Sequence, residues 1–261
     1  MTTETGYLGS LTADESNRLS LFKSQLSQWR QQNPQLASVE DHFRSTRHNV
    51  GEPDDVLNLK FLRARQFDVD VSRKLFTDFI AWRKEFAGGV DAITPESISK
   101  ELNSGKAFIF GKDFEGRPVL WIRSYLHKKR DSDPEEMKRM AVFMVEQLAK
   151  QLKPPIETAT ILCDMSRVKM ENVDMGFLRF LADMVTTRYP ESLGQALIMD
   201  APWLFNATWR VISPWLDAKT QNKIKFGKRS EVDKFIPAQY LLPEFGGSAV
   251  YPNGLSNPLS K

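Results

Sequence analysis

Apolar residues recur every three or four positions through the first third of the chain, which is the spacing of one face of a helix. This spacing predicts helices over 12–32, 54–65 and 68–86, and Thr12 with Glu15 has the pattern of a capping box at the start of the first. The Gly-Gly pair that follows the third helix predicts its end. This part of the chain therefore predicts a helical unit.

After Gly105 the pattern changes to short β-rich runs that alternate with helical spacing. The first two runs are joined by the turn-rich stretch 113–117, which predicts a β-hairpin. The expected elements in chain order are strands 107–110 and 118–122, helix 133–152, strand 159–163, helix 173–187, and strands 195–199 and 223–226. This alternation predicts an α/β fold class with a largely parallel sheet.

One predicted helix, 202–216, is apolar on nearly every side. Pro202 suits a first helical position and Pro214 marks the far end. The polar residues form one narrow stripe, which consists of Asn206, Arg210, Ser213 and Asp217. Leaving the large apolar side chains in water would forgo roughly 10–20 kcal/mol. The surplus face must therefore be buried in the core, line a cavity for a long apolar ligand, or touch a membrane.

Composition narrows the class of protein. The formal net charge of +3 is compatible with anionic membrane surfaces and does not indicate nucleic acid. The single cysteine, Cys163, leaves no internal disulfide and suits a reducing compartment. The N-terminus lacks the pattern of a secretory signal, and no apolar run approaches the roughly 20 residues that span a bilayer. We therefore expect a soluble cytoplasmic protein.

The motifs of common enzyme classes are absent from the sequence. There is no G-x-x-x-x-G-K-[ST], G-x-G-x-x-G or G-x-S-x-G. His42, His48 and His127 are scattered and lack metal-ligand spacing. Cys163 reads as a small buried thiol within a strand, and Asp164 at the end of that strand could be catalytic or could cap a turn. We expect no catalytic residue, no metal and no cofactor, and thus no enzyme.

Basic residues cluster at 128–130 and again at 223–229. Lys223 comes soon after the apolar helix, and an ammonium beside an apolar cavity would suit an amphiphile with an anionic head group. Glu191, ahead of the strand that leads to the same helix, could accept hydrogen bonds from head-group hydroxyls. The alternative is that these charges form solvated surfaces and salt bridges.

Together these stretches resemble the CRAL-TRIO family of lipid-exchange proteins, whose best-known fungal members transfer phosphatidylinositol. The resemblance covers about residues 54–247. Leu59-Lys-Phe-Leu-Arg-Ala-Arg-Gln-Phe-Asp68 resembles the N-terminal helical signature of the family. The other matching stretches are Asp113-Phe-Glu-Gly-Arg-Pro118, Tyr189-Pro-Glu-Ser-Leu-Gly194, Ala201-Pro-Trp203, Trp215-Leu-Asp217 and Leu242-Pro-Glu-Phe-Gly-Gly247.

The resemblance implies a helical N-terminal unit at 11–95 and a lipid-binding domain at 96–247, flanked by a disordered N-terminus at 1–10 and a tail at 248–261. The mixed, mostly parallel sheet would floor an apolar pocket, with the helix 202–216 as its mobile gate. The implied pocket and gate residues are Trp203, Phe205, Trp209, Ile212 and Trp215. The implied ligands of the lipid head group are Arg65, Glu191, Asp217, Thr220 and Lys223.

Two departures from the family pattern bear on the choice of lipid. Gln66 stands where the family often has lysine, so one cation at the head group is missing. Ala159 and Ile161 stand where members that bind phosphatidylcholine present serine and threonine hydroxyls. An apolar wall cannot replace those hydrogen bonds, which disfavours phosphatidylcholine. A more apolar second ligand, such as a sterol precursor, becomes the alternative.

The resemblance thus implies a monomeric lipid transfer protein that binds phosphatidylinositol in a buried apolar pocket and exchanges it between membranes, which it contacts transiently. The bound phospholipid would be a ligand and not a cofactor, and no nucleic acid is involved. The alternatives are a carrier of a neutral lipid (squalene, a sterol or a tocopherol-like molecule) and a lipid-gated regulator that presents phosphatidylinositol to a kinase.

Overall fold

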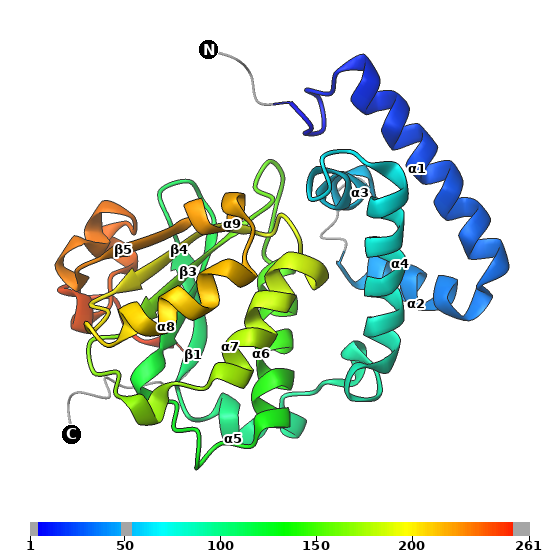
Figure 1. The fold of residues 1–261 in the computed structure, drawn as a ribbon. Helices are drawn as coiled ribbons and strands as arrows, with labels where there is room; N and C mark the ends of the chain where they lie inside the picture. The colour runs from blue at the N-terminus through cyan, green and yellow to red at the C-terminus, as the bar shows by residue number, and fades with distance from the viewer. Residues whose placement is uncertain (1–4, 48–53, 253–261) are drawn as a thin grey trace. The chain divides into compact units, whose positions relative to one another are not determined.

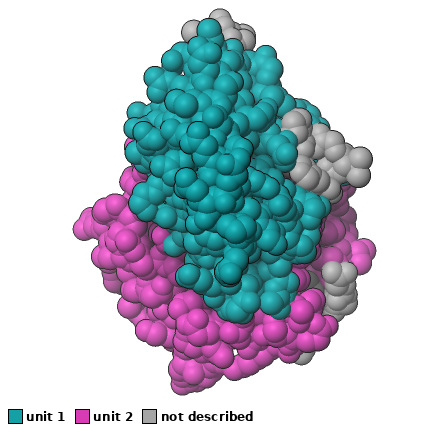
Figure 2. Space-filling view, turned by 90° about the vertical axis from the view of Figure 1, so that its right-hand side faces the viewer, with its two compact units in different colours: residues 1–93, 153–157, 184–192 teal, residues 94–152, 158–183, 193–261 magenta. Residues whose placement is uncertain are grey.

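The computed structural model describes residues 5–47 and 54–252. His48, residues 1–4 of the expected disordered terminus and residues 253–261 of the expected tail lie outside the described residues. Two compact units make up the chain (Figure 2). Unit 1 consists of 1–93, 153–157 and 184–192, and unit 2 consists of 94–152, 158–183 and 193–261.

The helices of unit 1 are α1 (Ala13–Gln32), α2 (Pro34–Arg47), α3 (Asp54–Arg63) and α4 (Val69–Glu85). Three of them confirm the helices expected from apolar spacing, whereas α2 was not expected. The capping box is confirmed: the amide of Glu15 donates to Oγ1 of Thr12 over 3.2 Å, and the amide of Thr12 donates to the Glu15 carboxylate over 2.7 Å. Two 3-10 turns, Phe86–Gly88 and Val90–Ala92, follow α4.

Aromatic side chains form the core of unit 1. Five phenylalanines from all four helices are almost fully buried, namely Phe22, Phe43, Phe61, Phe76 and Phe79. Tyr189, from the distant segment 184–192, packs edge-on against Phe79 with ring centroids 5.9 Å apart. It also packs edge-on against Trp82 at 6.1 Å. These contacts explain why a segment beyond residue 180 belongs to the helical unit.

The segment ahead of α1 also contacts unit 1. Residues 5–10 contain bends and turns without helix or strand. The guanidinium of Arg63 lies 4.1 Å from the ring centroid of Tyr7 and donates a hydrogen bond to the carbonyl of Gly6 over 3.0 Å. These contacts fix the described part of the N-terminus against α3.

Unit 2 is built on a five-stranded sheet with strand order β1-β2-β3-β4-β5. The strands are β1 (Ala107–Lys112), β2 (Pro118–Arg123), β3 (Ala159–Asp164), β4 (Leu193–Met199) and β5 (Ile224–Gly227). β1 and β2 form the expected antiparallel hairpin, and β2 to β5 are parallel. The α/β fold class with a mixed, mostly parallel sheet is therefore confirmed.

The helices of unit 2 are α5 (Ser99–Leu102), α6 (Pro134–Ala149), α7 (Met175–Asp183), α8 (Phe205–Ile212) and α9 (Ala218–Asn222). Figure 1 shows α6, α7 and α8 on one face of the sheet. A π-helical turn, Met184–Arg188, follows α7 and belongs to unit 1. No helix within 5–47 and 54–252 has the combination of length and apolar character that crossing a bilayer requires.

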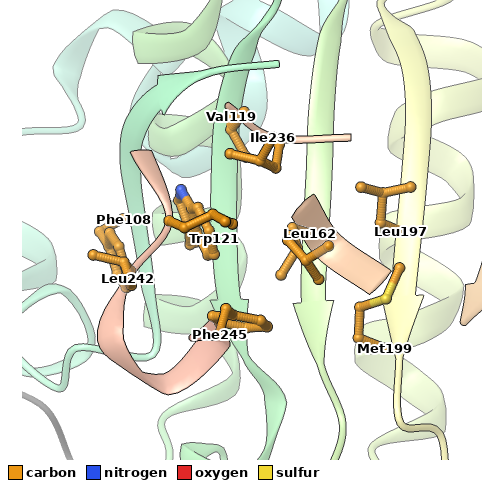
Figure 3. Close-up of a cluster of buried hydrophobic side chains, with 11 residues drawn as sticks. Phe108, Val119, Trp121, Leu162, Leu197, Met199, Ile236, Leu242 and Phe245 are labelled. Carbon is orange, nitrogen blue, oxygen red and sulfur yellow. The ribbon is translucent and has the colours of Figure 1, made fainter. Parts of the chain in front are cut away.

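The opposite face of the sheet is covered by the C-terminal part of unit 2. Figure 3 shows Trp121, Leu162 and Leu197 on three neighbouring strands, and Leu242 and Phe245 of the covering segment belong to the same buried cluster. The covering segment contains three 3-10 turns, Arg229–Lys234, Ala238–Tyr240 and Pro243–Phe245. Gly247 is required where this segment closes, because a Cβ there would lie 2.0 Å from the carbonyl oxygen of Leu241.

The helix expected over 202–216 is shorter than its pattern indicated. The α-helix begins at Phe205 and ends at Ile212, so the expectation that Pro202 occupies a first helical position is wrong. The amide of Phe205 donates to the carbonyl of Pro202 over 2.8 Å, which is the bond between residues i+3 and i of a single turn. Trp203 therefore precedes the helix, and Trp215 ends a separate 3-10 turn, Ser213–Trp215.

Candidate functional site

The face of the sheet beneath α8 is apolar but incompletely buried. Strand side chains alternate between the two faces, and Leu162 and Leu197 are fully buried on the side of the C-terminal segment. Their neighbours Ile161, Cys163 and Ile198 point to the other side and are only half-buried. We call these three residues, together with Ile122 of β2, the helix-side face.

Cys163 lies in β3 on the helix-side face and is half-buried. Burial raises the pKa of its thiol to about 12, because low-dielectric surroundings disfavour the thiolate, and the nearby charge of Asp164 adds to the effect. The raised pKa keeps the thiol protonated at neutral pH.

α8 lies over the helix-side face through aromatic contacts. Phe205 is buried in a cluster with Met165 and Val168, against which Cys163 and Ile198 also pack. Trp209 packs edge-on against Phe226 of β5, with ring centroids 5.3 Å apart. Of the other expected gate residues, Ile212 and Trp215 are half-buried, and the guanidinium of Arg179 lies 5.0 Å from the Trp215 ring centroid. Trp203 is 86% exposed.

Both ends of the segment 200–216 are held by polar contacts. Asp200 has a positive φ of 51°, and its carboxylate accepts a hydrogen bond from the amide of Arg229 over 3.2 Å. At the other end, the Gln221 side chain donates to the carbonyls of Ser213 and Leu216, each over 2.9 Å. The helix between these points makes mainly apolar contacts with the sheet.

α7 adds a second apolar surface to unit 2. Of its nine residues only Ala182 is fully buried. Its large apolar side chains are half-buried, and these are Met175, Phe177, Leu178, Phe180 and Leu181. The rings of Phe177 and Phe180 stack with centroids 6.4 Å apart. α7 is therefore apolar on more of its surface than tight packing covers.

Three of the expected head-group residues belong to unit 2. The carboxylate of Asp217 caps α9: it accepts hydrogen bonds from the amide of Thr220 over 2.8 Å and from the Thr220 hydroxyl over 2.7 Å. Burial alone would raise the pKa of Asp217, but these hydrogen bonds outweigh it and lower the pKa below its ordinary value. Lys223 follows α9 and is half-buried.

Arg65 and Glu191, the other two expected head-group residues, belong to unit 1. Arg65 lies in the turn after α3, where its guanidinium donates to the carbonyl of Ala64 over 2.8 Å and to that of Thr186 over 3.4 Å. Glu191 is half-buried and has a positive φ of 52°. Gln66, which follows Arg65, is exposed. The assignment of all five residues to a lipid head group remains a prediction.

A buried polar network that sequence patterns did not indicate lies on the other face of the sheet. The carboxylate of Asp113, in the β1–β2 turn, accepts hydrogen bonds from the Thr160 hydroxyl over 2.6 Å and from the Gln195 amide over 3.1 Å. Gln195 in turn accepts from the ammonium of Lys225 over 3.0 Å. The available signal was polar residues within otherwise apolar strands. Because this network faces away from α8, it is not a candidate lipid contact.

Gly194 is also explained by this region. The side chain of Arg117 crosses Gly194, and a Cβ there would lie 2.6 Å from Cδ of Arg117. Arg117 donates through Nε to the hydroxyl of Thr158 over 3.1 Å, so its path is fixed. The glycine in the stretch 189–194 therefore serves close packing at the start of β4.

The turn-capping alternative for Asp164 is the one observed. Its carboxylate accepts a hydrogen bond from the amide of Ser166 over 3.0 Å and lies 3.8 Å from the guanidinium of Arg229. Beside it, Arg123 forms an ion pair with Glu244 at 2.9 Å. Among the described residues there is no group of three or more histidine, cysteine, aspartate and glutamate side chains that could hold a metal ion.

Comparison with known proteins identifies two matching family models. The model described as CRAL/TRIO domain matches residues 102–247, and the model described as CRAL/TRIO, N-terminal domain, matches residues 19–78. These matches confirm the resemblance inferred from the motifs. The crystal structure of Sfh5 shares the fold, with a TM-score of 0.60 at 19% identity over 76% of this chain and 73% of that one.

Curated relatives extend the match to fungal proteins. CRAL-TRIO domain-containing protein C3H8.02 of Schizosaccharomyces pombe is 39% identical over 207 residues, which cover 76% of this chain and 46% of that protein. Phosphatidylinositol transfer protein CSR1 of Eremothecium gossypii is 35% identical over 210 residues, covering 76% and 48%. The chain thus spans about half the length of these two relatives. Sec14 cytosolic factor of Schizosaccharomyces pombe is 29% identical over 230 residues, covering 77% of both chains.

Proposed function

The chain belongs to the CRAL/TRIO family, and from this premise we propose that it binds a lipid in unit 2 and transfers it between membranes. Two relatives support the proposal: one is named a phosphatidylinositol transfer protein, and another is named Sec14 cytosolic factor. The proposed activity is physical transport, which requires an apolar binding space and a way for lipid to enter it, and no bond is made or broken.

The observation that carries the proposal is the state of the helix-side face. Ile161, Cys163 and Ile198 retain accessible surface, yet Cys163 and Ile198 lie against the apolar cluster that Phe205 of α8 forms with Met165 and Val168. Both properties are expected of side chains that line an apolar recess beneath α8 and α7. Two acyl chains contain roughly 30 methylenes, and exposing them to water costs about 0.8 kcal/mol each, or some 24 kcal/mol. A recess of this kind would offset most of that cost.

We propose that α8 is the gate to this recess. Its contacts with the sheet are apolar, so a membrane interior could replace them at little cost, whereas its two ends are held by polar contacts near Asp200 and Gln221. A helix held at both ends and loosely packed between them suits hinged opening between two populated states. Trp209 and Ile212 would then contact lipid or bilayer when the gate opens.

Phosphatidylinositol is the proposed ligand. Lys223 and Arg65 are the cations proposed for its phosphate, which accepts strong charge-assisted hydrogen bonds. Glu191, Asp217 and Thr220 are proposed for the inositol hydroxyls. Since Asp217 and Thr220 already bond to each other, they would have to share or exchange that bond with the ligand. Their capping role is therefore the competing explanation for these two residues.

A neutral lipid is the second candidate, and the orientation of β3 favours it. The one hydroxyl in the stretch 159–161 belongs to Thr160, and it donates to Asp113 on the opposite face of the sheet. Ile161 is the residue that this stretch presents to the helix-side face. This stretch of β3 therefore offers no hydroxyl on the helix-side face to a choline head group. It offers an apolar surface, against which an isoprenoid or sterol could pack.

The deciding experiment is to identify the lipid that copurifies with the protein by extracting it with organic solvent and recording its mass spectrum. Phosphatidylinositol in stoichiometric amount, together with transfer of labelled phosphatidylinositol between vesicles, supports the main proposal. An isoprenoid or sterol supports the second candidate. Phosphatidylinositol binding and stimulation of a lipid kinase without bulk transfer would favour a lipid-gated regulator. A protein that neither copurifies with lipid nor takes it up from vesicles would contradict all three.

A further inference from the structure

Loops from two parallel strands meet at one edge of unit 2. β2 and β3 run in the same direction, so the loops after their carboxyl ends emerge at the same edge of the sheet. The side chain of Asn172 ties these loops together by donating to the carbonyl of His127 over 2.6 Å and to that of Tyr125 over 3.2 Å. The amide of Lys129 adds a bond to the carbonyl of Glu171 over 3.3 Å.

This edge concentrates positive charge. Exposed cations occupy both loops, and we call them the basic edge: Lys128, Lys129, Arg130, Arg167 and Lys169. Within 127–131 and 167–171 the acidic residues are Asp131 and Glu171. Asp131 pairs with Arg130 at 3.3 Å, whereas Lys128, Lys129 and Lys169 have no ion-pair partner among the described residues. The two short segments carry a net charge of +3, equal to that of the entire chain.

Apolar side chains project from the same edge. Met170, between Lys169 and Glu171, is 68% exposed. Trp203, in the loop after the carboxyl end of β4, is 86% exposed. Large apolar side chains that project among lysines and arginines are characteristic of proteins that bind the interface of an anionic bilayer. A nucleic acid would neutralise the cations but would offer no apolar phase for Met170.

We propose that the basic edge docks the protein onto anionic lipid bilayers, with Met170 entering the head-group region. This inference rests on the proposed function and deepens it by naming the class of membrane. Neither Met170 nor any cation of the basic edge is an expected gate or head-group residue, whereas Trp203 is an expected gate residue and is left out of the docking assignment. Docking and lipid exchange are therefore assigned to different side chains, which allows them to be tested separately.

The test measures binding to phosphatidylcholine vesicles with and without phosphatidylserine, by flotation. The variant is the triple charge reversal Lys128→Glu, Lys129→Glu and Lys169→Glu. Its matched control is the triple reversal Lys112→Glu, Lys150→Glu and Lys153→Glu, which makes the same change in net charge away from the basic edge. From the attraction of single basic residues to an anionic surface, we expect the variant to lose about 100-fold or more in partitioning to phosphatidylserine vesicles. The control should lose much less.

Two further measurements keep the test specific. Wild-type binding should weaken as salt is raised, and Met170→Gln should weaken binding without changing that salt dependence. Equal losses for the two triple variants, or undiminished binding of the basic-edge variant, would overturn the inference. Tight binding to nucleic acid with none to vesicles would also overturn it.

The inference and the proposed function can fail separately. A basic-edge variant that keeps its copurified lipid but binds phosphatidylserine vesicles as well as wild type would refute only the basic edge. If the wild-type protein carries no lipid, and the charge-reversed variant binds phosphatidylserine vesicles less than the wild type does, only the carrier function would be refuted.

Discussion

The indole of Trp209 packs edge-on against the ring of Phe226, with 5.3 Å between centroids, and so joins α8 to the last strand of the sheet. Phe226 is 49% exposed, so the contact lies at the margin of the apolar cluster and not at its centre. Phe205 makes a second, looser contact with the same ring at 6.2 Å. A gate that opens must break this pair, which makes Trp209 the most informative residue of α8.

Replacing Trp209 with aspartate should slow lipid uptake. The carboxylate would meet the apolar cluster when the gate is closed and lipid when it is open. We expect the transfer rate to fall by about tenfold or more, equivalent to about 1.4 kcal/mol. Val211→Asp is the matched control, since Val211 lies on the same helix and is 51% exposed. Fluorescent-lipid transfer measures the rate, and equal rates for the two variants would place the gate elsewhere.

The double variant Glu191→Ala and Lys223→Ala should reduce transfer of phosphatidylinositol while the fold is retained. Loss of hydrogen bonds to charged groups costs about 1.5–3 kcal/mol each, so losing both residues should lower the affinity by about 100-fold or more. Lys219→Ala, a nearby exposed lysine, is the control. Circular dichroism checks the fold. Unchanged transfer would remove these residues from the head-group assignment and favour a neutral ligand.

Asp217 can be assigned to capping or to lipid binding by comparing stability with affinity. Asp217→Ala removes the cap of α9 and should cost about 0.5–2 kcal/mol. Hydrogen bonds lower the pKa of Asp217 in the folded state. The ionised carboxylate therefore stabilises the fold at pH values above its ordinary pKa of about 3.9, and this stabilisation is lost as the pH falls through the pKa of the folded state. Urea unfolding at neutral and acid pH measures this difference.

Asp217→Ser retains an oxygen that can cap α9 and removes the charge. If capping is the whole role, this variant should keep both wild-type stability and wild-type lipid affinity. Wild-type stability with weakened phosphatidylinositol binding would instead assign the carboxylate to the head group.

The buried bond between Thr160 and Asp113 should contribute measurably to stability. Thr160→Val keeps the shape of the side chain but leaves a buried carboxylate without one of its donors, at a cost of about 1–3 kcal/mol. The control is Thr158→Val. In the wild type the Thr158 hydroxyl accepts a hydrogen bond from Arg117, and Thr158 is half-buried whereas Thr160 is fully buried. Equal unfolding midpoints for the two variants would show that the network contributes little.

Cys163 should react slowly with alkylating reagents in the folded protein. With a pKa of about 12 in place of 9.0, the thiolate fraction at pH 8 falls about 1000-fold. The raised pKa means that the fold favours the neutral thiol, so this contribution to stability is present at neutral pH and is lost as pH rises above the ordinary value. Iodoacetamide labelling with and without denaturant measures the ratio, and similar rates would contradict the burial.

The sequence predicted those parts of the fold that depend on neighbours along the chain. The capping box at Thr12, the helix over 68–86 and the hairpin around 113–117 follow from local spacing and turn chemistry, and all three are observed. The start of α8 was misjudged because Pro202 permits a helix but does not compel one. The turn at Trp203 and the positive φ at Asp200 set the boundary instead.

Local sequence patterns predicted only part of the candidate site. The excess of apolar residues in 202–216 indicated an unusual helix. The pattern did not indicate that the Thr220 hydroxyl would bond to Asp217. It also did not indicate that Thr160 would point toward Asp113, on the face of the sheet opposite to Ile161. The missing information was which side of each strand faces the helices. That choice is made by packing across the sheet.

By itself the sequence determined the strands, most of the helices, the fold class and the excess of apolar surface, because these depend on periodicity and on residues within a few positions of one another. Only the tertiary structure decided that Tyr189 joins the helical unit, that Cys163 is half-buried on the helix-side face, and that the basic loops at 128–130 and 167–169 are tied together. Those features depend on contacts between residues far apart in the chain, whose free energy is realised only when the chain has folded.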